Sequence, residues 1–291
     1  MSHSRVFLLI VAAIICALAL QRVITRRLEP EHNPVVESPK TEMHKLPSEV
    51  ERQATVSTSS ATFRVPILMY HYVENITDKQ DTIRQSLNVP PNVFDAQVST
   101  LKNAGYTFMT AGELADVIDG KIKLPDKPVL LTFDDGHWDV DTVILPILKK
   151  YQAKATSYII TGFTGGSDFM TQSQIQEVIS SGLVEIGAHT VHHISLKGQR
   201  ATVVKKELAD SKNALETLYH IPVVSFAYPN GSFDKQAVDA VHDAGYTNAV
   251  STLPGIEANN TNRFYIPRIR PGRRTGASLL TLLENTTFKN R

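Results

Sequence analysis

The sequence predicts an α/β fold, a distorted barrel of about seven or eight parallel strands with helices around it. From residue 63 onward, short apolar runs alternate with segments of helical period, which is the pattern of βα units around a parallel sheet. About eight such runs fit within roughly 225 residues, as a (β/α)7-8 barrel requires. No glycine-rich dinucleotide turn follows the first run, so a barrel is favoured over an open doubly wound sheet.

The predicted strands are short and apolar, and turn residues bound them. They span residues 66–70, 106–109, 129–133, 156–160, 184–188, 223–228, 248–251 and 265–269. Between them, Thr110 with Glu113 and Thr171 with Gln174 form capping boxes, which predict the beginnings of two helices. A longer amphipathic helix is expected across residues 204–218.

The N-terminal region carries a hydrophobic segment. Residues 6–20 are an unbroken apolar run flanked by arginines, so we interpret residues 1–24 as a signal-anchor or transmembrane segment. The small-x-small pattern at 17–19 keeps a cleaved signal as the alternative. The expected location is the cell membrane, with a single-pass anchor and an extracellular domain. A secreted protein would result if the signal were cleaved.

The region between this segment and the barrel differs in composition. Residues 25–62 are rich in Pro, Ser, Thr, Glu and Lys and poor in aromatic residues, so they cannot bury enough apolar surface to fold. We interpret them as a flexible linker, and residues 63–291 as one folded domain.

The net charge and the cysteine content exclude several classes of protein and of metal site. The formal net charge is +1, with 30 Lys and Arg against 29 Asp and Glu, so the basic field of a nucleic-acid-binding protein is missing. The single cysteine, Cys16, lies in the apolar N-terminal run, so the domain has neither a disulfide framework nor a thiolate metal site. Any metal must be bound by His, Asp or Glu. The sequence implies no protein partner.

Polar residues follow several predicted strands at the point where each strand ends. In a β/α barrel these ends meet at one face, which carries the reacting groups. The polar residues at these positions are His71, Asp134, Asp135, His189, His193 and Asn230.

The two histidines and one aspartate predict a metal site. His189 and His193 are four residues apart and can reach one cation, and Asp135 from another strand end adds a carboxylate. Such a set leaves positions open for water, as hydrolytic zinc requires. Neighbouring residues in an extended stretch point in different directions, so one carboxylate of Asp134 and Asp135 can bind the metal while the other accepts a proton.

Each residue also has a plain structural interpretation. An Asp-Asp-Gly sequence after a strand is often only a turn, and a single histidine such as His71 is usually a hydrogen-bonded structural residue. His192 more often points away from the metal, and His137 has no comparable setting, so we treat it as solvated or structural.

The motifs, taken in order, resemble those of the polysaccharide deacetylase family, the NodB-homology domain of carbohydrate esterase family 4. The resemblance covers about residues 65–270. The matching motifs are Thr132-Phe133-Asp134-Asp135-Gly136, His189-Thr190-x-x-His193 and Phe226-Ala227-Tyr228-Pro229-Asn230-Gly231.

The resemblance implies an activity and a set of roles. Asp135, His189 and His193 would bind Zn²⁺ or another divalent transition metal, and Asp134 would be the catalytic base. The implied reaction is hydrolysis of N-acetyl groups on an N-acetylated polysaccharide by zinc-bound water. The backbone N–H of Asn230 would stabilise the oxyanion.

The general acid follows from one branch of the family. In most members it is a histidine in a C-terminal motif, which this sequence lacks. In the branch resembling the biofilm poly-N-acetylglucosamine deacetylases it is a histidine after the first strand, and His71 matches that placement. This branch favours poly-N-acetylglucosamine as the polymer, with peptidoglycan next.

Two positions depart from the family pattern. Ala227 stands where many members carry an arginine that orients the base, so we expect Arg268, or alternatively Arg270, to orient Asp134. Asn230 stands where an aromatic residue is common, which leaves the breadth of substrates open.

Three alternatives remain open at this stage. A glycosidase could use Asp134 with Asp139 or Glu185, because sugar hydrolysis needs two carboxyl groups. A non-haem iron oxygenase also uses two histidines and one carboxylate. A catalytically silent carbohydrate-binding or cell-wall scaffold protein could retain the same fold.

Overall fold

The computed structural model describes residues 61–285. The predicted membrane segment, and the predicted linker up to residue 60, lie outside these residues. Within 61–285, no helix is both long enough and apolar enough to cross a membrane.

The predicted strands form a nearly closed parallel barrel. Seven strands follow one another in the order β10-β8-β7-β6-β5-β4-β2, and β3 pairs with β4 outside this path. Every pairing among them is parallel. In chain order the strands are β2 (Ile67–Tyr70), β3 (Thr107–Met109), β4 (Pro128–Phe133), β5 (Ala155–Ile159), β6 (Val184–Ala188), β7 (Ser225–Ala227), β8 (Asn248–Pro254) and β10 (Ile266–Arg268).

The barrel closes between its last strand and its first. The backbone N–H of Met69 donates to the carbonyl of Ile269 at 2.9 Å, and the N–H of Ile269 donates to Ile67 at 2.8 Å. These bonds form a single parallel bridge between Leu68 and Ile269 instead of a long ladder. The ring is therefore nearly closed, with a short seam beside β10.

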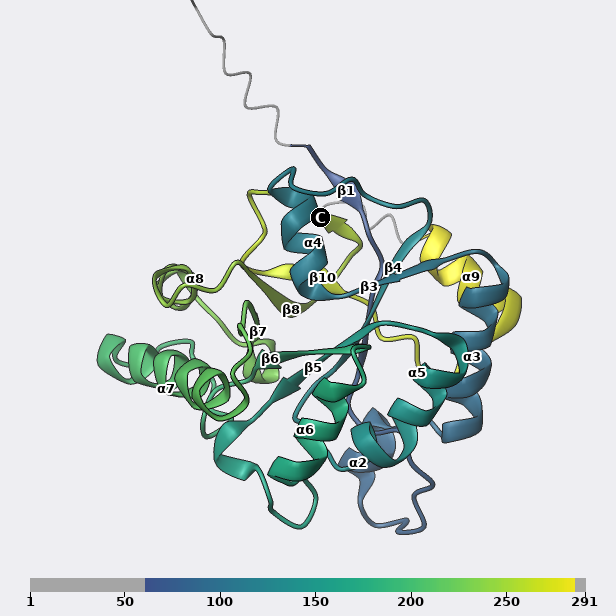
Figure 1. Cartoon of the computed structure of the whole chain (residues 1–291), viewed down its shortest axis with the longest axis horizontal. Coiled ribbons are helices and arrows are strands. Elements are labelled where there is room, and N and C mark those ends of the chain that lie inside the picture. The colour runs from purple at the N-terminus through teal and green to yellow at the C-terminus, as the bar shows by residue number, and fades with distance from the viewer. Residues whose placement is uncertain (1–60, 286–291) are drawn as a thin grey trace, which may run out of the picture. The chain divides into compact units, whose positions relative to one another are not determined.

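Helices surround the strands (Figure 1). They are α2 (Thr82–Leu87), α3 (Pro91–Asn103), α4 (Ala111–Ile118), α5 (Leu145–Tyr151), α6 (Gln172–Ser180), α7 (Ala201–Tyr219), α8 (Lys235–Asp243) and α9 (Gly276–Asn285). Both predicted capping boxes are confirmed, at Thr110 for α4 and at Thr171 for α6.

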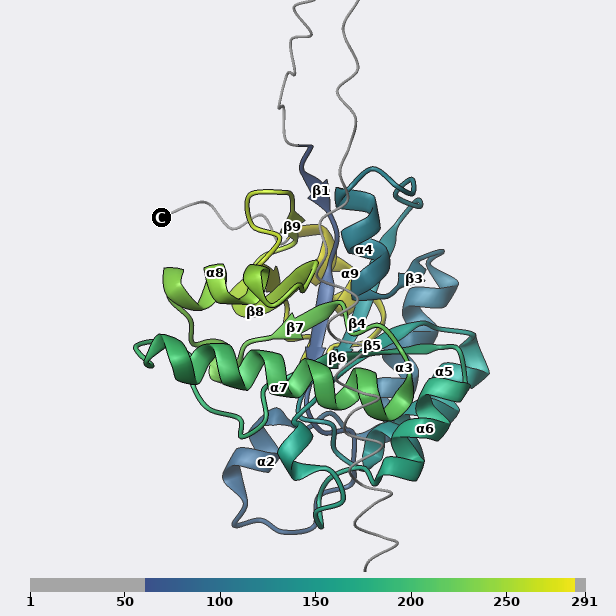
Figure 2. The ribbon, with the colours of Figure 1, turned by 60° about the vertical axis from the view of Figure 1, so that its left-hand side comes forward.

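Each predicted strand overlaps an observed one, because alternating apolar runs are long enough to be recognised. Two strands were not predicted, β1 (Phe63–Arg64) and β9 (Glu257–Ala258), which pair antiparallel in a separate small sheet. Two residues are too few for a periodic signal. Figure 2 shows this sheet at one end of the barrel and α2 at the opposite end, where the parallel strands finish.

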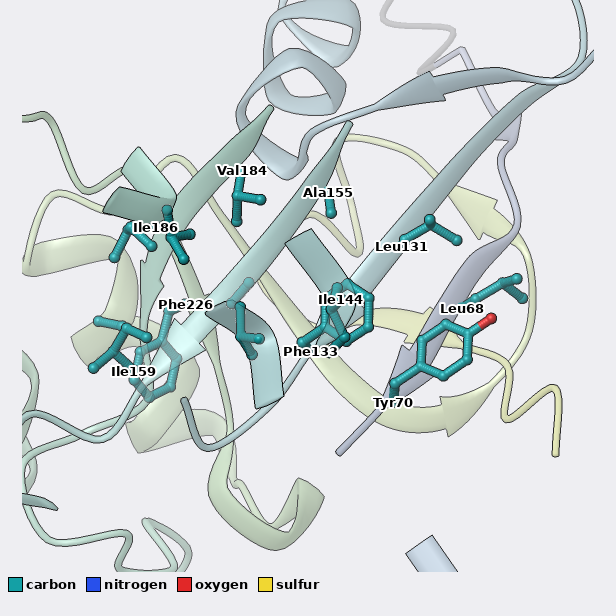
Figure 3. Packing of buried hydrophobic residues seen from close by; sticks show 14 of the residues in the cluster. Leu68, Tyr70, Leu131, Phe133, Ile144, Ala155, Ile159, Val184, Ile186 and Phe226 are labelled. Atoms are coloured by element: carbon teal, nitrogen blue, oxygen red, sulfur yellow. The ribbon is translucent and has the colours of Figure 1, made fainter. Parts of the chain in front are cut away.

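Side-chain alternation divides the core into two clusters. Leu131 and Phe133 of β4 belong to the larger cluster, which also contains helix residues, and Figure 3 shows them among its side chains. Phe133 stacks on Tyr70 with ring centroids 5.3 Å apart. Leu130, which precedes Leu131 on β4, belongs to a second cluster with residues of α4. The next inward position after Leu130 is the buried Thr132, so the interior becomes polar toward the carboxyl ends of the strands.

We expect Leu131→Ala to lower the free energy of unfolding by about 2–5 kcal/mol, because it removes a fully buried side chain and leaves a cavity. Leu218→Ala on α7 is the matched control, since that leucine is 47% exposed and its loss should change stability by less than about 0.5 kcal/mol. Urea unfolding of the full-length chain, followed by circular dichroism, measures both. Equal effects at the two positions would contradict this core.

Candidate metal and catalytic site

A cavity of about 470 Å³ lies at the carboxyl ends of the strands. Its lining contains every strand-end residue that the sequence analysis selected: His71, Asp134, Asp135, His189, His193 and Asn230. Arg268 does not line the cavity, because it is buried in the barrel interior. The structure thus brings together residues from four βα loops, as the convergence of parallel strands requires.

Asp135 and the two histidines form a compact cluster of metal-binding groups. Oδ1 of Asp135 lies 3.4 Å from Nε2 of His189 and 3.3 Å from Nε2 of His193. Ligands bound at about 2.1 Å in a tetrahedron are separated by roughly 3.4 Å, so these spacings suit one ion. Oδ1 of Asp135 is buried and has no hydrogen-bond partner among residues 61–285. A bound cation would give this oxygen the partner that a buried polar atom needs.

The protonation of the cluster also suits a cation. Nδ1 of His189 lies 2.7 Å from the carbonyl oxygen of Ala227, which can only accept, so the proton is on Nδ1 and Nε2 is free to bind a metal. Burial raises the pKa of Asp135, but the three imidazoles beside its carboxylate outweigh burial and hold that pKa well below its usual value. The carboxylate is therefore ionised. Together the three side chains could hold a divalent ion.

The loops that carry the site hold an unusual backbone conformation. Asp135, Thr190, His193 and Asn230 all have positive φ values, 74°, 65°, 54° and 58° respectively, although none is glycine. This conformation is uncommon for residues other than glycine, and such residues cluster at functional sites.

Asp134 is held by the buried guanidinium of Arg268. Nη1 and Nη2 of Arg268 donate to Oδ1 and Oδ2 of Asp134, each at 2.7 Å, and Nε donates to the carbonyl of Ser251 at 2.8 Å. Burial raises the pKa of Asp134, but the charge and hydrogen bonds of Arg268 outweigh it and hold the pKa below its usual value. The contact expected from the sequence is therefore present, and it comes from Arg268.

His71 lies beside Asp134 in the cavity. Its Nε2 is 4.0 Å from Oδ2 of Asp134, and its Nδ1 is buried with no hydrogen-bond partner in the described part of the chain. Burial lowers the pKa of His71, and the carboxylates of Asp134 and Asp135 oppose that effect. The imidazole and the carboxylate of Asp134 thus face the same space.

Asn230 lies on the short 3₁₀ turn Pro229–Gly231 after β7. The N–H of Gly231 donates to the carbonyl of Tyr228 at 2.9 Å, which closes the turn. Gly231 has a φ of 64°, and a Cβ there would come within 1.8 Å of Oγ1 of Thr252, so only glycine fits. The turn fixes the backbone of Asn230 at the cavity.

Sequence reasoning missed His137, which it treated as solvated or structural. The ring is buried, 3% exposed, and its Nε2 lies 3.4 Å from Oδ2 of Asp135. Its position directly after Gly136 in the strand-end motif was the one available signal. His192 was expected to point away from the metal, and its Nδ1 contacts Oε1 of Glu207 at 2.7 Å.

Asp139 and Glu185, the carboxylates considered for a glycosidase, accept hydrogen bonds from other parts of the chain, and neither lines the cavity. Asp139 accepts a hydrogen bond from the backbone N–H of Val73. Glu185 accepts from Oγ1 of Thr110 at 2.8 Å and from the N–H of Gly112 at 3.0 Å, at the start of α4. The suggested partners of Asp134 in that reaction are thus absent from its cavity.

Comparison with known proteins gives a consistent result. Residues 121–249 match the sequence profile described as polysaccharide deacetylase. YxkH of Bacillus subtilis, assigned as a polysaccharide deacetylase, is 31% identical over 207 residues, which are 71% of each chain. The poly-beta-1,6-N-acetyl-D-glucosamine N-deacetylase of Staphylococcus aureus is 29% identical over 199 residues, 64% of this chain and 68% of that protein.

A solved structure extends the match to three dimensions. The Streptococcus pyogenes deacetylase PplD, in complex with acetate, superimposes with a TM-score of 0.70 and is 31% identical. The match covers 78% of this chain and 99% of PplD.

Removing the Arg268 side chain should leave the buried carboxylate of Asp134 without a partner. We expect Arg268→Met to lower the free energy of unfolding by about 3–5 kcal/mol, because it leaves the carboxylate of Asp134 buried without a partner. Adding Asp134→Asn should recover a large part of that loss, since the uncompensated charge disappears. A double-mutant cycle by urea unfolding measures the coupling, and simple addition of the two effects would count against the ion pair.

Asp139 should make stability depend on pH. Burial raises its pKa from 3.8 to about 6, against the opposing hydrogen bond from Val73. Because the folded state keeps the proton to higher pH than the unfolded chain, this aspartate destabilises the fold as pH rises from about 4 to about 6. The stability of wild type relative to Asp139→Asn should fall by about 3 kcal/mol across that window. Urea titrations of both proteins at each pH test this, and a constant difference would refute it.

Proposed function

The chain belongs to the polysaccharide deacetylase family, and from this premise we propose that it hydrolyses N-acetyl groups on a polysaccharide containing N-acetylglucosamine, in a metal-dependent reaction. The observation that carries the proposal is one cavity that contains both an ionised, Arg268-bound Asp134 and the cluster of Asp135, His189 and His193.

The metal would be held by Asp135, His189 and His193. Two imidazoles and one carboxylate are the donor set of hydrolytic zinc, although another divalent transition metal could occupy the same groups. When bound, the ion supplies a Lewis acid and lowers the pKa of water.

The remaining residues of the cavity divide the proton transfers. Asp134 takes a proton from the attacking water, which adds to the acetamide carbonyl carbon. Arg268 keeps the Asp134 carboxylate ionised and fixed in orientation. The backbone N–H of Asn230 donates to the oxyanion that forms, and its turn holds it in place beforehand.

His71 completes the reaction. As the C–N bond breaks, the sugar nitrogen needs a proton, and His71 faces the same space as Asp134. The products are acetate and a free amine on the sugar. A cavity histidine outside the metal cluster thus acts as the acid, as in the family branch that the sequence resembles.

The polymer we favour is poly-N-acetylglucosamine, with peptidoglycan next. Support comes from the similarity to the staphylococcal enzyme named for that polymer, together with the placement of His71. Both polymers lie outside the cytoplasm, which agrees with the proposed anchor in residues 1–24 or, alternatively, a cleaved signal there. The sequence alone supports that location.

The direct test is acetate release from poly-N-acetylglucosamine oligomers by the full-length protein. We expect chelator to abolish release and zinc to restore it. Asp134→Asn should lower kcat by at least about 100-fold, and His71→Ala by about 10²–10⁴-fold, because each removes one proton transfer. Asp239→Asn on α8, whose carboxylate is exposed, is the matched control and should leave kcat unchanged.

The same assay also tests the alternative that the protein is a catalytically silent carbohydrate-binding or scaffold protein. If zinc-loaded protein releases no acetate from poly-N-acetylglucosamine or from peptidoglycan, the binding or scaffold interpretation replaces the enzyme. Release from peptidoglycan alone would keep the reaction and reassign the polymer.

A further inference from the structure

We propose that Glu207 on α7 is a positioning residue for the metal site. Its carboxylate binds the backbone between His189 and His193 and thereby sets where the second imidazole lies relative to the first. This inference rests on the proposed function and adds to it a residue from a surrounding helix, which does not line the cavity.

The segment that joins the two histidines has a backbone conformation that needs support. After the end of β6 at Ala188, residues 189–193 belong to no helix or strand. Thr190 and His193 have φ values of 65° and 54°, and a left-handed backbone is unfavourable for residues that carry a Cβ. Neighbouring groups must therefore stabilise this segment if the imidazole of His193 is to stay beside Asp135.

Glu207 binds the middle of the segment. Its Oε2 accepts hydrogen bonds from the N–H of Val191 at 2.9 Å and from the N–H of His192 at 3.1 Å. A backbone N–H can only donate, so these two bonds do not depend on the protonation of any imidazole. One carboxylate oxygen thus fixes two consecutive residues between the proposed metal ligands.

The carbonyl groups of the same segment are bound from the other side. The N–H of Thr161 donates to the carbonyl of Thr190 at 3.2 Å, and the N–H of Gly162 donates to that of Val191 at 2.9 Å. A Cβ on Gly162 would come within 2.5 Å of the Val191 oxygen, so the close approach requires glycine. The 3₁₀ turn Thr161–Phe163 therefore holds the carbonyls, and α7, which crosses the front of Figure 2, holds the N–H groups.

The burial of Glu207 requires an explanation that packing does not give. Its neighbours on the buried side of α7 include Val204, Leu208 and Leu215, and Glu207 is itself only 7% exposed. A buried carboxylate is unfavourable unless hydrogen bonds compensate for the lost water, whereas an apolar side chain would carry no such cost. The bonds to the segment between the two histidines supply both the compensation and a reason for the carboxylate.

Two substitutions separate the acceptor from the bulk of the side chain. Glu207→Met removes the acceptor and keeps an unbranched side chain, whereas Glu207→Gln keeps one oxygen that can accept both N–H bonds. Glu216→Met is the matched control on the same helix, because Glu216 also accepts a backbone N–H, from Val223 at 3.0 Å, and Val223 does not line the cavity. The readout is the zinc dissociation constant of the full-length protein, measured by competition with a chromophoric chelator.

We expect Glu207→Met to weaken zinc binding by about 10–100-fold, because the segment between the ligands relaxes, and Glu207→Gln to recover most of that loss. Glu216→Met should leave the zinc dissociation constant unchanged. The inference would be overturned by wild-type zinc affinity in Glu207→Met, by an equal loss in Glu216→Met, or by a Gln variant as weak as the Met variant.

A measurement on the metal-free wild type covers the case in which Glu207→Met does not fold. Hydrogen exchange followed by NMR should show slow exchange at the amides of Val191 and His192, because both donate to a buried carboxylate. Fast exchange at both amides would overturn the inference while leaving zinc binding intact. A wild-type protein that keeps slow exchange but binds no zinc would instead overturn the proposed metal site, so the two failures are distinguishable.

Discussion

The buried ion pair between Arg268 and Asp134 is the constraint on which the site depends. Asp134 follows β4 and Arg268 ends β10, so this pair joins one side of the barrel interior to the seam where the ring closes. Arg268 also binds the carbonyl of Ser251 on β8 and Oγ1 of Thr132 on β4. A buried ion pair adds little net stability, because desolvation offsets attraction, but the loss of either partner would leave the other charge buried and unpaired.

The same ion pair explains how two adjacent aspartates can differ in role. Alternation along the strand turns Asp134 into the interior, where Arg268 satisfies both of its oxygens. Asp135 has a left-handed backbone, and its carboxylate faces three imidazoles instead. One carboxylate is thus fixed as an anion by a permanent cation, while the other is surrounded by groups that can share a metal. Environment, rather than residue type, separates them.

The sequence predicted those parts of the structure that depend on local periodicity. All eight parallel strands, and the strand-end residues, follow from alternation and from the convergence of carboxyl ends. β1 and β9 were not predictable, because two residues carry no period. His137 was missed because its environment comes from Tyr72 and Phe169, which lie on distant loops. Asp139 was named as a possible second carboxylate of a glycosidase, but it does not line the cavity. The sequence could not show this, because the burial of Asp139 and its bond to Val73 depend on tertiary packing.

The positions of the residues that line the cavity also indicate which part of the site must select the polymer. The acetamide group is common to poly-N-acetylglucosamine and peptidoglycan, so the floor of the cavity, which acts on that group, cannot distinguish them. Discrimination requires contacts with the neighbouring sugars, and these can come only from the rim. Ile83 on α2 and Phe163 after β5 line the cavity and are 72% and 36% exposed, and Arg270 lines it from the loop after β10. Because loops on a rigid barrel can vary without disturbing the ion pair beneath, selectivity can change there while the reaction is retained.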